Sequence, residues 1–274
     1  MTGEGKALGD SNIIPNALSF DFLAFKSLTT LILNQVEIHP DKIGTFGMLR
    51  NTLVSLEATC CELKCISDLL LGDMPNSHTQ IVQNTSDGMV NAQLENEFRN
   101  SANNNYAWKE LQYLNLRDNN ITVIDQSINL VPQVRTLLLG VNLIKQIENL
   151  EGLSNLSDLE LSDNHLESLE LLHTKLGQIT SLDLANNKIR SLAGCSKLYS
   201  LININAASNK INDMDNVLPV SHLPCLESLN LQGNHVTTVV DYRLKVFEAF
   251  GKRCSDLCLG TYMSRRLLNN SAPS

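Results

Sequence analysis

Leucine and isoleucine residues recur along this chain in a fixed frame of 11 positions. The frame is clearest in LSDLELSDNHL, from Leu156 to Leu166, where leucines occupy positions 1, 4, 6 and 11. Position 9 is Asn164, an amide among apolar residues. The same frame recurs over residues 111–121, 134–144, 179–189, 201–211 and 226–236.

The asparagines at position 9 give the period of the pattern. They are Asn119, Asn142, Asn164, Asn187, Asn209 and Asn234, and their successive spacings are 23, 22, 23, 22 and 25 residues. A repeat of this length and pattern indicates a leucine-rich repeat, in which each unit contributes one strand and a tight, partly helical return. We therefore predict an α/β solenoid: a curved leucine-rich repeat of the short 22-residue class, with about eight repeats and a C-terminal capping helix.

The asparagines have a structural interpretation. Where a short strand turns into its return, backbone N–H and C=O groups point inward, and each would cost roughly 1–3 kcal/mol if left without a hydrogen bond. An amide both donates and accepts, so stacked asparagines bridge the backbone of one repeat to that of the next. We predict a structural asparagine ladder through these six residues.

The frame also predicts how the domain is organised. A leucine-rich repeat domain is expected over residues 20–262, after an N-terminal extension at 1–19 and before a disordered tail at 263–274. Degenerate repeats span 28–70, with Val36 and Cys61 at position 9, and regular repeats span 108–240. Phe20, Phe22 and Phe25 are expected to cover the open N-terminal end. The polar segment 72–107 has no periodicity and is predicted to be an inserted loop, either without a role or a docking loop.

Residues 241–262 are predicted to form the C-terminal cap. Apolar residues there follow a helical stripe, which comprises Tyr242, Val246, Phe247, Phe250, Cys254 and Leu257. Asp241 is a candidate N-cap, and Gly251 is expected to end or bend the helix. Such a helix would cover the last leucine layer, which would otherwise expose a large apolar patch.

Composition narrows the function. Of 274 residues, 43% are hydrophobic, which permits a large core, and the formal net charge of −8 argues against nucleic-acid binding. No apolar run approaches the roughly 20 residues that span a bilayer, so direct membrane insertion is not expected. The N-terminus lacks a secretory signal, and the seven cysteines do not suggest a disulfide framework, so a cytoplasmic location is expected.

Catalytic and metal-binding patterns are not found. The sequence has no phosphate-binding glycine loop, no G-x-S-x-G elbow and no H-E-x-x-H pair. His173 and Cys195 could form a nucleophile pair, but Cys195 holds an apolar framework position and is expected to be buried and inert. The clusters Cys60, Cys61, Cys65 and Cys254, Cys258 lack zinc-site spacing. We predict a non-enzymatic protein with no metal and no cofactor.

We expect this architecture to bind a partner protein on the concave face, where the strands of the solenoid lie. The residues predicted to bind a partner are Tyr113, Leu138, Val141, Asp158, Glu160, Asp163 and Asp183. The four acids form a patch beside two apolar side chains, which suits a basic or basic-hydrophobic segment of another protein. The alternative is that the acids only keep this face soluble. A calcium site is disfavoured because strands do not wrap around an ion as a loop does.

The sequence resembles the leucine-rich domains of the nischarin family over residues 172–211 and 223–253. The resemblance depends on residues outside the leucine frame: HTKLG at 173–177, KLYSL at 197–201, LPCLE at 223–227 and DYR at 241–243. The match extends over about residues 108–260, and the first hundred residues are closer to the family's kinase-interacting members. This resemblance implies a scaffold in control of the cytoskeleton and cell migration, cytoplasmic or, in a longer form, endosome-associated. Implied partners are p21-activated or LIM-type kinases, Rac-type GTPases and an integrin alpha tail.

Two other functions are considered. Short leucine-rich repeats also occur in regulatory subunits of protein phosphatases, whose concave face grips the catalytic subunit. They also occur in ribonucleoprotein components, although the net charge of −8 and the lack of a basic face count against RNA contact here.

Overall fold

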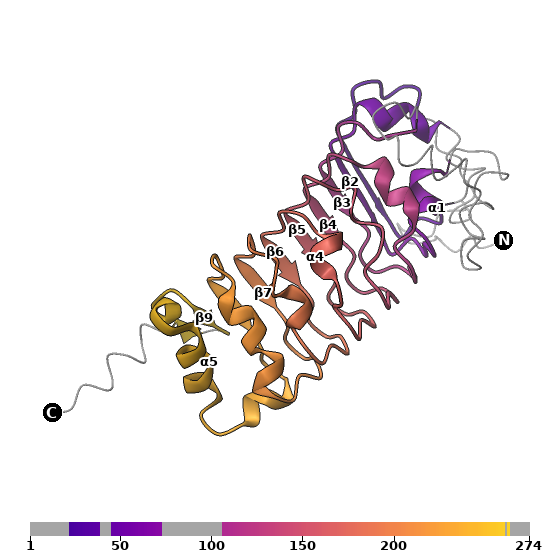
Figure 1. Ribbon diagram of the computed structural model, residues 1–274. Helices are drawn as coiled ribbons and strands as arrows, with labels where there is room; N and C mark the ends of the chain where they lie inside the picture. The colour runs from indigo at the N-terminus through magenta and orange to yellow at the C-terminus, as the bar shows by residue number, and fades with distance from the viewer. Residues whose placement is uncertain (1–21, 39–44, 73–105, 261, 264–274) are drawn as a thin grey trace, which may run out of the picture.

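The computed structural model describes residues 22–38, 45–72, 106–260 and 262–263. Over these residues the strands form one 10-stranded sheet, and each strand lies beside its neighbours in sequence (Figure 1). The strands are β1 (Thr30–Asn34), β2 (Ser55–Thr59), β3 (Tyr113–Asn115), β4 (Thr136–Leu138), β5 (Asp158–Glu160), β6 (Ser181–Asp183), β7 (Asn203–Asn205), β8 (Ser228–Asn230), β9 (Cys258–Leu259) and β10 (Tyr262–Met263). The pairs from β1 to β9 are parallel, and β10 runs antiparallel to β9.

The register places the same framework position of successive repeats side by side. Leu114 pairs with Leu137, Leu137 with Leu159, and Leu159 with Leu182. Because alternate side chains of a strand point to opposite faces, these residues all point inward, and each is at most 2% exposed. The predicted leucine-rich repeat solenoid is confirmed.

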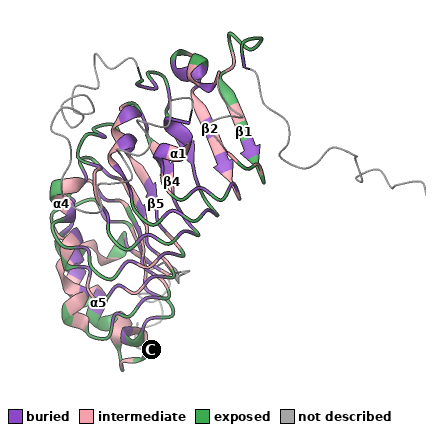
Figure 2. Cartoon of the chain, turned by 90° about the vertical axis from the view of Figure 1, so that its right-hand side faces the viewer, coloured by how far each residue is buried: buried purple, intermediate pink, exposed green. Residues whose placement is uncertain are grey.

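Short helical turns carry the chain back to the next strand, and they lie on the side of the solenoid away from the sheet (Figure 2). They are η2 (Phe46–Asn51), α1 (Ser67–Leu70), η5 (Gln126–Leu130), α4 (Leu172–Lys175), η6 (Ala193–Cys195), η7 (Met214–Asn216), η8 (Leu218–His222) and η9 (His235–Thr238). The core is a single layer of aliphatic side chains between the sheet and these returns.

Each framework asparagine links the backbones of two repeats. Asn164 donates from Nδ2 to the carbonyl of Leu139 in the preceding repeat at 2.9 Å and to those of Leu161 and Ser162 in its own. Its Oδ1 accepts the backbone N–H of Ile144 at 2.9 Å. Asn119, Asn142, Asn187, Asn209 and Asn234 bond in the same way.

Cys61 occupies the asparagine position of the second repeat and uses the same acceptors. Its thiol donates to the carbonyls of Leu33 at 3.6 Å and Thr59 at 3.2 Å. Its backbone N–H donates to Oδ1 of Asn119 at 2.9 Å. A small donor therefore extends the hydrogen-bonding pattern into the degenerate N-terminal repeats.

The N-terminal end of the core is aromatic. Phe22 is buried and lies 5.6 Å from Phe46, whose ring is 5.0 Å from that of Trp108. Phe25 was expected to share this cover, but its side chain is 53% exposed, so that prediction is wrong. Phe20 and the extension 1–19 lie outside the described residues.

Strands β2 and β3 pair directly, although the segment 72–107 separates their repeats in sequence. Asp125 strengthens this junction because its carboxylate accepts the backbone N–H groups of Ile66 (2.8 Å), Ser67 (3.2 Å) and Ser127 (2.9 Å). Burial raises the pKa of the Asp125 carboxyl, and these hydrogen bonds oppose the rise. Most of the predicted insertion lies outside the described residues.

The C-terminal cap differs from the single helix that the apolar stripe predicted. Helix α5 (Tyr242–Phe250) ends at Gly251, whose φ is 57°, and η10 (Gly251–Ser255) follows it. The chain then returns to the sheet as β9, so Cys254 and Leu257 do not continue the helix. Asp241 precedes α5 but makes no side-chain capping bond. The guanidinium of Arg253 instead donates to the carbonyls of Leu223 and Leu226. The predicted tail lies almost wholly outside the described residues.

Candidate functional site

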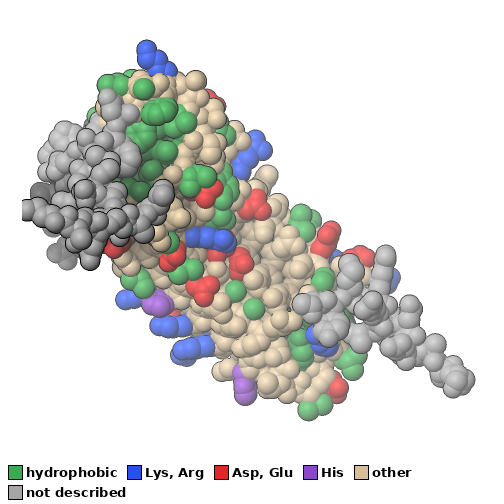
Figure 3. Space-filling view, turned by 180° about the vertical axis from the view of Figure 1, so that it is seen from behind, with side chains coloured by type: hydrophobic (Ala, Val, Ile, Leu, Met, Phe, Trp, Pro, Cys, Tyr) green, Lys and Arg blue, Asp and Glu red, His purple; other side chains and the backbone are tan. Residues whose placement is uncertain are grey.

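Most of the residues predicted to bind a partner lie on four neighbouring strands of the concave face. Leu138 of β4 pairs with Glu160 of β5, and Glu160 pairs with Asp183 of β6. Two residues before Glu160, Asp158 lies between Thr136 and Ser181 in the same register. Acidic side chains gather at the middle of this face (Figure 3).

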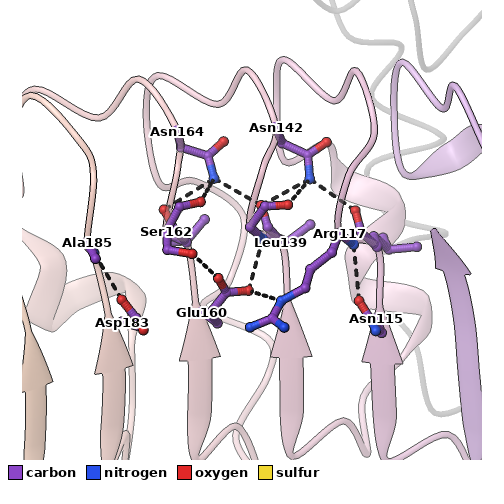
Figure 4. A network of polar contacts seen from close by, with 12 residues as sticks. Asn115, Arg117, Leu139, Asn142, Glu160, Ser162, Asn164, Asp183 and Ala185 are labelled. Carbon is purple, nitrogen blue, oxygen red and sulfur yellow. Dashed lines mark hydrogen bonds and ion pairs between the residues drawn. The ribbon is translucent and has the colours of Figure 1, made fainter. Parts of the chain in front are cut away.

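Glu160 is not a free charge on this face, which corrects the sequence-based interpretation. Its side chain is buried, and Oε2 lies 2.8 Å from Nε of Arg117. The same oxygen accepts the backbone N–H of Gly140 at 3.0 Å, and Oε1 accepts the hydroxyl of Ser162 (Figure 4). Gly140 makes room for the carboxylate, because a Cβ there would overlap it. The hydrogen bond to Glu160 raises the pKa of Arg117, which remains charged.

Breaking this pair should cost stability. In Arg117→Met, Glu160 keeps two neutral donors but loses its cation, and we expect the free energy of unfolding to fall by about 1–2 kcal/mol. Solvent screens this pair, because the Arg117 side chain is 46% exposed. Urea unfolding of Arg117→Met, Glu160→Gln and the double variant measures the coupling. Additive losses would show that the two side chains do not interact in solution.

No cationic side chain of the described residues is bonded to the other three acids of the predicted patch. Asp158 accepts a hydrogen bond from Ser157 Oγ at 2.5 Å. Asp183 accepts the N–H of Ala185 at 2.9 Å and Nδ2 of Asn205 at 3.1 Å. Asp163 is exposed. Within the described part of the chain, Arg117–Glu160 is the ion pair of this face, and none of the three aspartates forms one.

Two further acids extend the face toward the N-terminus, and the sequence analysis did not include them in the patch. Glu57 of β2 accepts Nδ2 of Asn115 at 3.2 Å, and exposed Asp118 lies 3.0 Å from the Cys60 thiol. Their frame positions, 5 and 8, are those of Glu160 and Asp163. Applying the frame to the degenerate second repeat would have identified Glu57.

An apolar strip borders the acids. Leu138 is half-buried on β4, and Val141, three residues later, is 48% exposed. Tyr113 of β3 is half-buried, and burial together with the charge of Glu57 raises the pKa of its hydroxyl. The strip gives an incoming segment an apolar contact beside the carboxylates.

Val141 has an unfavourable backbone conformation. Position 8 is left-handed in every regular repeat, and Asp118, Asp163, Asn186, Ser208 and Gly233 occupy it elsewhere. Val141 takes the same conformation with φ 54°, although the left-handed region disfavours β-branched residues. The chain thus holds an exposed apolar side chain at a backbone position that suits asparagine or glycine.

Replacing Val141 should therefore stabilise the fold. We expect Val141→Asn to raise the free energy of unfolding by about 1 kcal/mol, because asparagine tolerates the left-handed region. Urea unfolding followed by circular dichroism measures this gain. The matched control is Val123→Asn, since Val123 is 49% exposed and is not among the residues with positive φ. An equal gain in both variants would show that backbone strain is not the cause.

Nothing in the described residues assembles a reactive centre. Cys195 is fully buried, and burial raises its pKa to about 12. Burial and a hydrogen bond to Asp68 raise the pKa of Cys65 to about 12. Among the residues with assigned positions, no group of three or more histidine, cysteine or acidic side chains is arranged to hold a metal. Within the same part of the chain, no helix combines the length and apolar character needed to cross a membrane.

Comparison with known proteins agrees with this architecture. Residues 109–166 match the leucine rich repeat family. Internalin C2 of Listeria monocytogenes has a similar fold, with a TM-score of 0.52 and 20% identity over 76% of this chain and 72% of the internalin chain. An internalin F of the same organism gives a TM-score of 0.58 and 18% identity over 89% and 58%. At such identities the likeness shows the fold alone.

Sequence relatives include proteins named for a kinase partner. Serine/threonine-protein kinase 11-interacting protein of Gallus gallus is 33% identical over 129 residues, which is 46% of this chain and 12% of that protein. Its Homo sapiens counterpart is 26% identical over 163 residues, 59% and 15% of the two chains. Tubulin-folding cofactor E of Arabidopsis thaliana is 33% identical over 117 residues, 40% and 22%. The chain therefore spans about an eighth of the length of the kinase-interacting relatives.

Proposed function

We propose that this leucine-rich repeat protein is a non-catalytic scaffold whose concave face binds a basic or basic-hydrophobic segment of a signalling protein. The observation that carries the proposal is the group Asp158, Asp163 and Asp183, which forms no ion pair within the described residues and lies beside Leu138 and Val141. Leucine-rich repeat domains are typical of protein–protein interaction scaffolds, and their relatives of known fold are typically non-catalytic.

Electrostatics supports a basic partner. Like charges on neighbouring strands repel one another, and a lysine or arginine placed between them relieves that repulsion. The guanidinium of Arg117 is bonded to Glu160 and forms no ion pair with the three aspartates. A segment with several basic residues would gain both association rate and orientation from this field.

The strain at Val141 supports an apolar contact next to these charges. Val141 is a β-branched residue at a backbone position that disfavours such residues, and its side chain is exposed on the proposed binding face. Leu138 lies on the strand immediately before it. We expect the bound segment to place an aliphatic or aromatic side chain on these two residues.

The partner class follows from resemblance. The nischarin-like motifs and the kinase 11-interacting relatives favour a signalling kinase, with p21-activated and LIM-type kinases as the first candidates. Rac-type GTPases and an integrin alpha tail are the other candidates, in control of the cytoskeleton and cell migration. We propose a cytoplasmic location for this role.

A protein phosphatase regulatory subunit is the alternative. It uses the same concave face, so the structure of the face does not separate the two. Activity assays do: adding the purified chain to candidate kinases and to phosphatase catalytic subunits shows which activity changes.

The experiment uses three matched baits of the full chain in a pull-down with quantitative mass spectrometry. One is wild type, and one carries Asp158→Asn, Asp163→Asn and Asp183→Asn, which keeps the side-chain acceptors and suits the left-handed position. The control carries Asp213→Asn, Asp215→Asn and Glu170→Gln, which removes as much charge from exposed sites on the returns. Kinases, Rac-type GTPases or integrin tails lost only from the first variant would support the proposal. Equal capture by all three baits would refute it.

A further inference from the structure

The C-terminal repeats contain a cavity of about 730 Å³ whose charged side chains are all basic. Its lining residues are Arg190, Asn209, Lys210, Asn212, Gly233, Asn234, His235, Thr237 and Thr238. No carboxylate is among them, although the chain carries a formal net charge of −8.

Three successive repeats supply the basic residues. Lys210 and His235 both follow a framework asparagine, and Arg190 follows the last position of the preceding frame. Backbone hydrogen bonds hold these turns together: Lys210 N–H donates to Ile189 at 2.8 Å, and Val236 N–H donates to Ile211 at 2.9 Å. The repeat geometry therefore fixes the spacing of the three side chains.

Within the described residues, the side chains of Arg190, Lys210 and His235 form no ion pair. All three are exposed, so their basic nitrogen atoms are accessible. Basic side chains, drawn in blue and purple, follow one edge of the concave face, separate from the acids at its middle (Figure 3). The cavity thus presents unneutralised donors suited to a compact, multiply charged anion.

We propose that this cavity binds a phosphorylated serine or threonine side chain of a partner protein. Arginine and lysine together match the oxygens of a phosphate ester, and phosphate groups gain charge-assisted hydrogen bonds from such clusters. The amide of Asn212 and the Thr237 and Thr238 oxygens can bond the peptide backbone on either side. Both hydroxyls already donate to carbonyls, so their oxygens remain as acceptors.

The surroundings favour a phosphopeptide over an extended anionic surface. Exposed Asp213, Asp215 and Asp241 follow the lining residues in sequence. A lipid membrane or an RNA backbone extends over a wider surface that includes these carboxylates, whereas a single phosphate ester contacts only the basic side chains. Both of those surfaces also need several clustered basic residues for useful affinity.

Fluorescence polarisation with the full chain tests the proposal. The probes are a degenerate peptide library with a fixed central phosphoserine or phosphothreonine, the same library unphosphorylated, and vesicles containing phosphoinositides. We expect the phosphorylated library to bind at least about ten-fold more tightly than its counterpart and orthophosphate to compete with it. Arg190→Gln with Lys210→Gln should abolish the difference. Lys109→Gln with Lys145→Gln, the same charge change at exposed sites outside the cavity, should preserve it.

Three results would overturn the proposal. Phosphorylated and plain libraries that bind alike would remove the phosphate specificity. Vesicles that bind more tightly than any peptide, with loss in the Arg190 and Lys210 variant, would assign the cavity to lipid headgroups. Orthophosphate binding with no gain from the peptide would leave a simple anion site. None of these results depends on the acidic residues of the concave face.

Discussion

Asn164→Leu should lower the free energy of unfolding by about 3–5 kcal/mol, although it places an apolar side chain in an apolar core. The amide of Asn164 is 4% exposed and makes four hydrogen bonds to backbone groups of two repeats. Leucine leaves the Ile144 N–H buried without a partner, at roughly 1–3 kcal/mol. It also removes one hydrogen bond, worth about 0.5–1.5 kcal/mol, from each of the three carbonyls, which keep a second donor in Asn142, Asn187 or the Val141 N–H. Urea unfolding followed by circular dichroism measures the loss.

Asn120→Leu is the matched control for this prediction. Asn120 is exposed at position 10, and the next repeat already has a leucine, Leu143, at that position. We expect its free energy of unfolding to stay within about 0.5 kcal/mol of wild type. Similar losses in both variants would show that the ladder asparagine has no special role in the repeat.

Gly194→Ala should be the second most damaging single change, with a loss of about 2–4 kcal/mol. Gly194 lies in η6, where adjacent returns approach closely, and a Cβ built on it would overlap the backbone carbonyl of Leu169. A carbonyl of the neighbouring return cannot rotate away as the end of a side chain can, so the backbone of two repeats must shift.

The comparison is Gly177→Ala. No atom lies within 4 Å of a Cβ built on Gly177, and its φ is not positive. Alanine there should leave stability unchanged or raise it by about 0.4–1 kcal/mol by restricting the unfolded chain. Thermal unfolding of both variants checks the pair. If Gly194→Ala were as stable as Gly177→Ala, the returns would not lie as close together at Gly194 as described.

The sequence predicted the solenoid because a repeated frame is a local pattern with a known three-dimensional meaning. Positions 4, 6 and 11 point inward in every regular repeat, so Leu159, Leu161 and Leu166 could be assigned to the core directly. The second repeat followed the same logic, with Cys61 as a substitute donor. The structure of the two ends of the solenoid could not be predicted from the frame. A terminal repeat has only one neighbour, and the residues that cover it are not periodic.

The candidate face was harder to predict, because contacts between neighbouring side chains decide which charges are free. Four acids at outward positions looked equivalent in sequence. The structure shows that Glu160 is bonded to Arg117, 43 residues earlier, whereas Asp163 is exposed. The contacts of Trp108 and Asp125 could not be predicted for the same reason, since their partners lie in repeats that the frame does not link to them.

The central claim is that the concave acids and the adjacent apolar strip bind a basic segment. The most direct test is a titration of a panel of basic-hydrophobic peptides, with scrambled acidic peptides as controls, against wild type and against the Asp158→Asn, Asp163→Asn, Asp183→Asn variant. Binding that weakens about ten-fold or more in the variant, and that falls as salt is raised, is the predicted result. Peptides that bind both proteins equally at every salt concentration would contradict it.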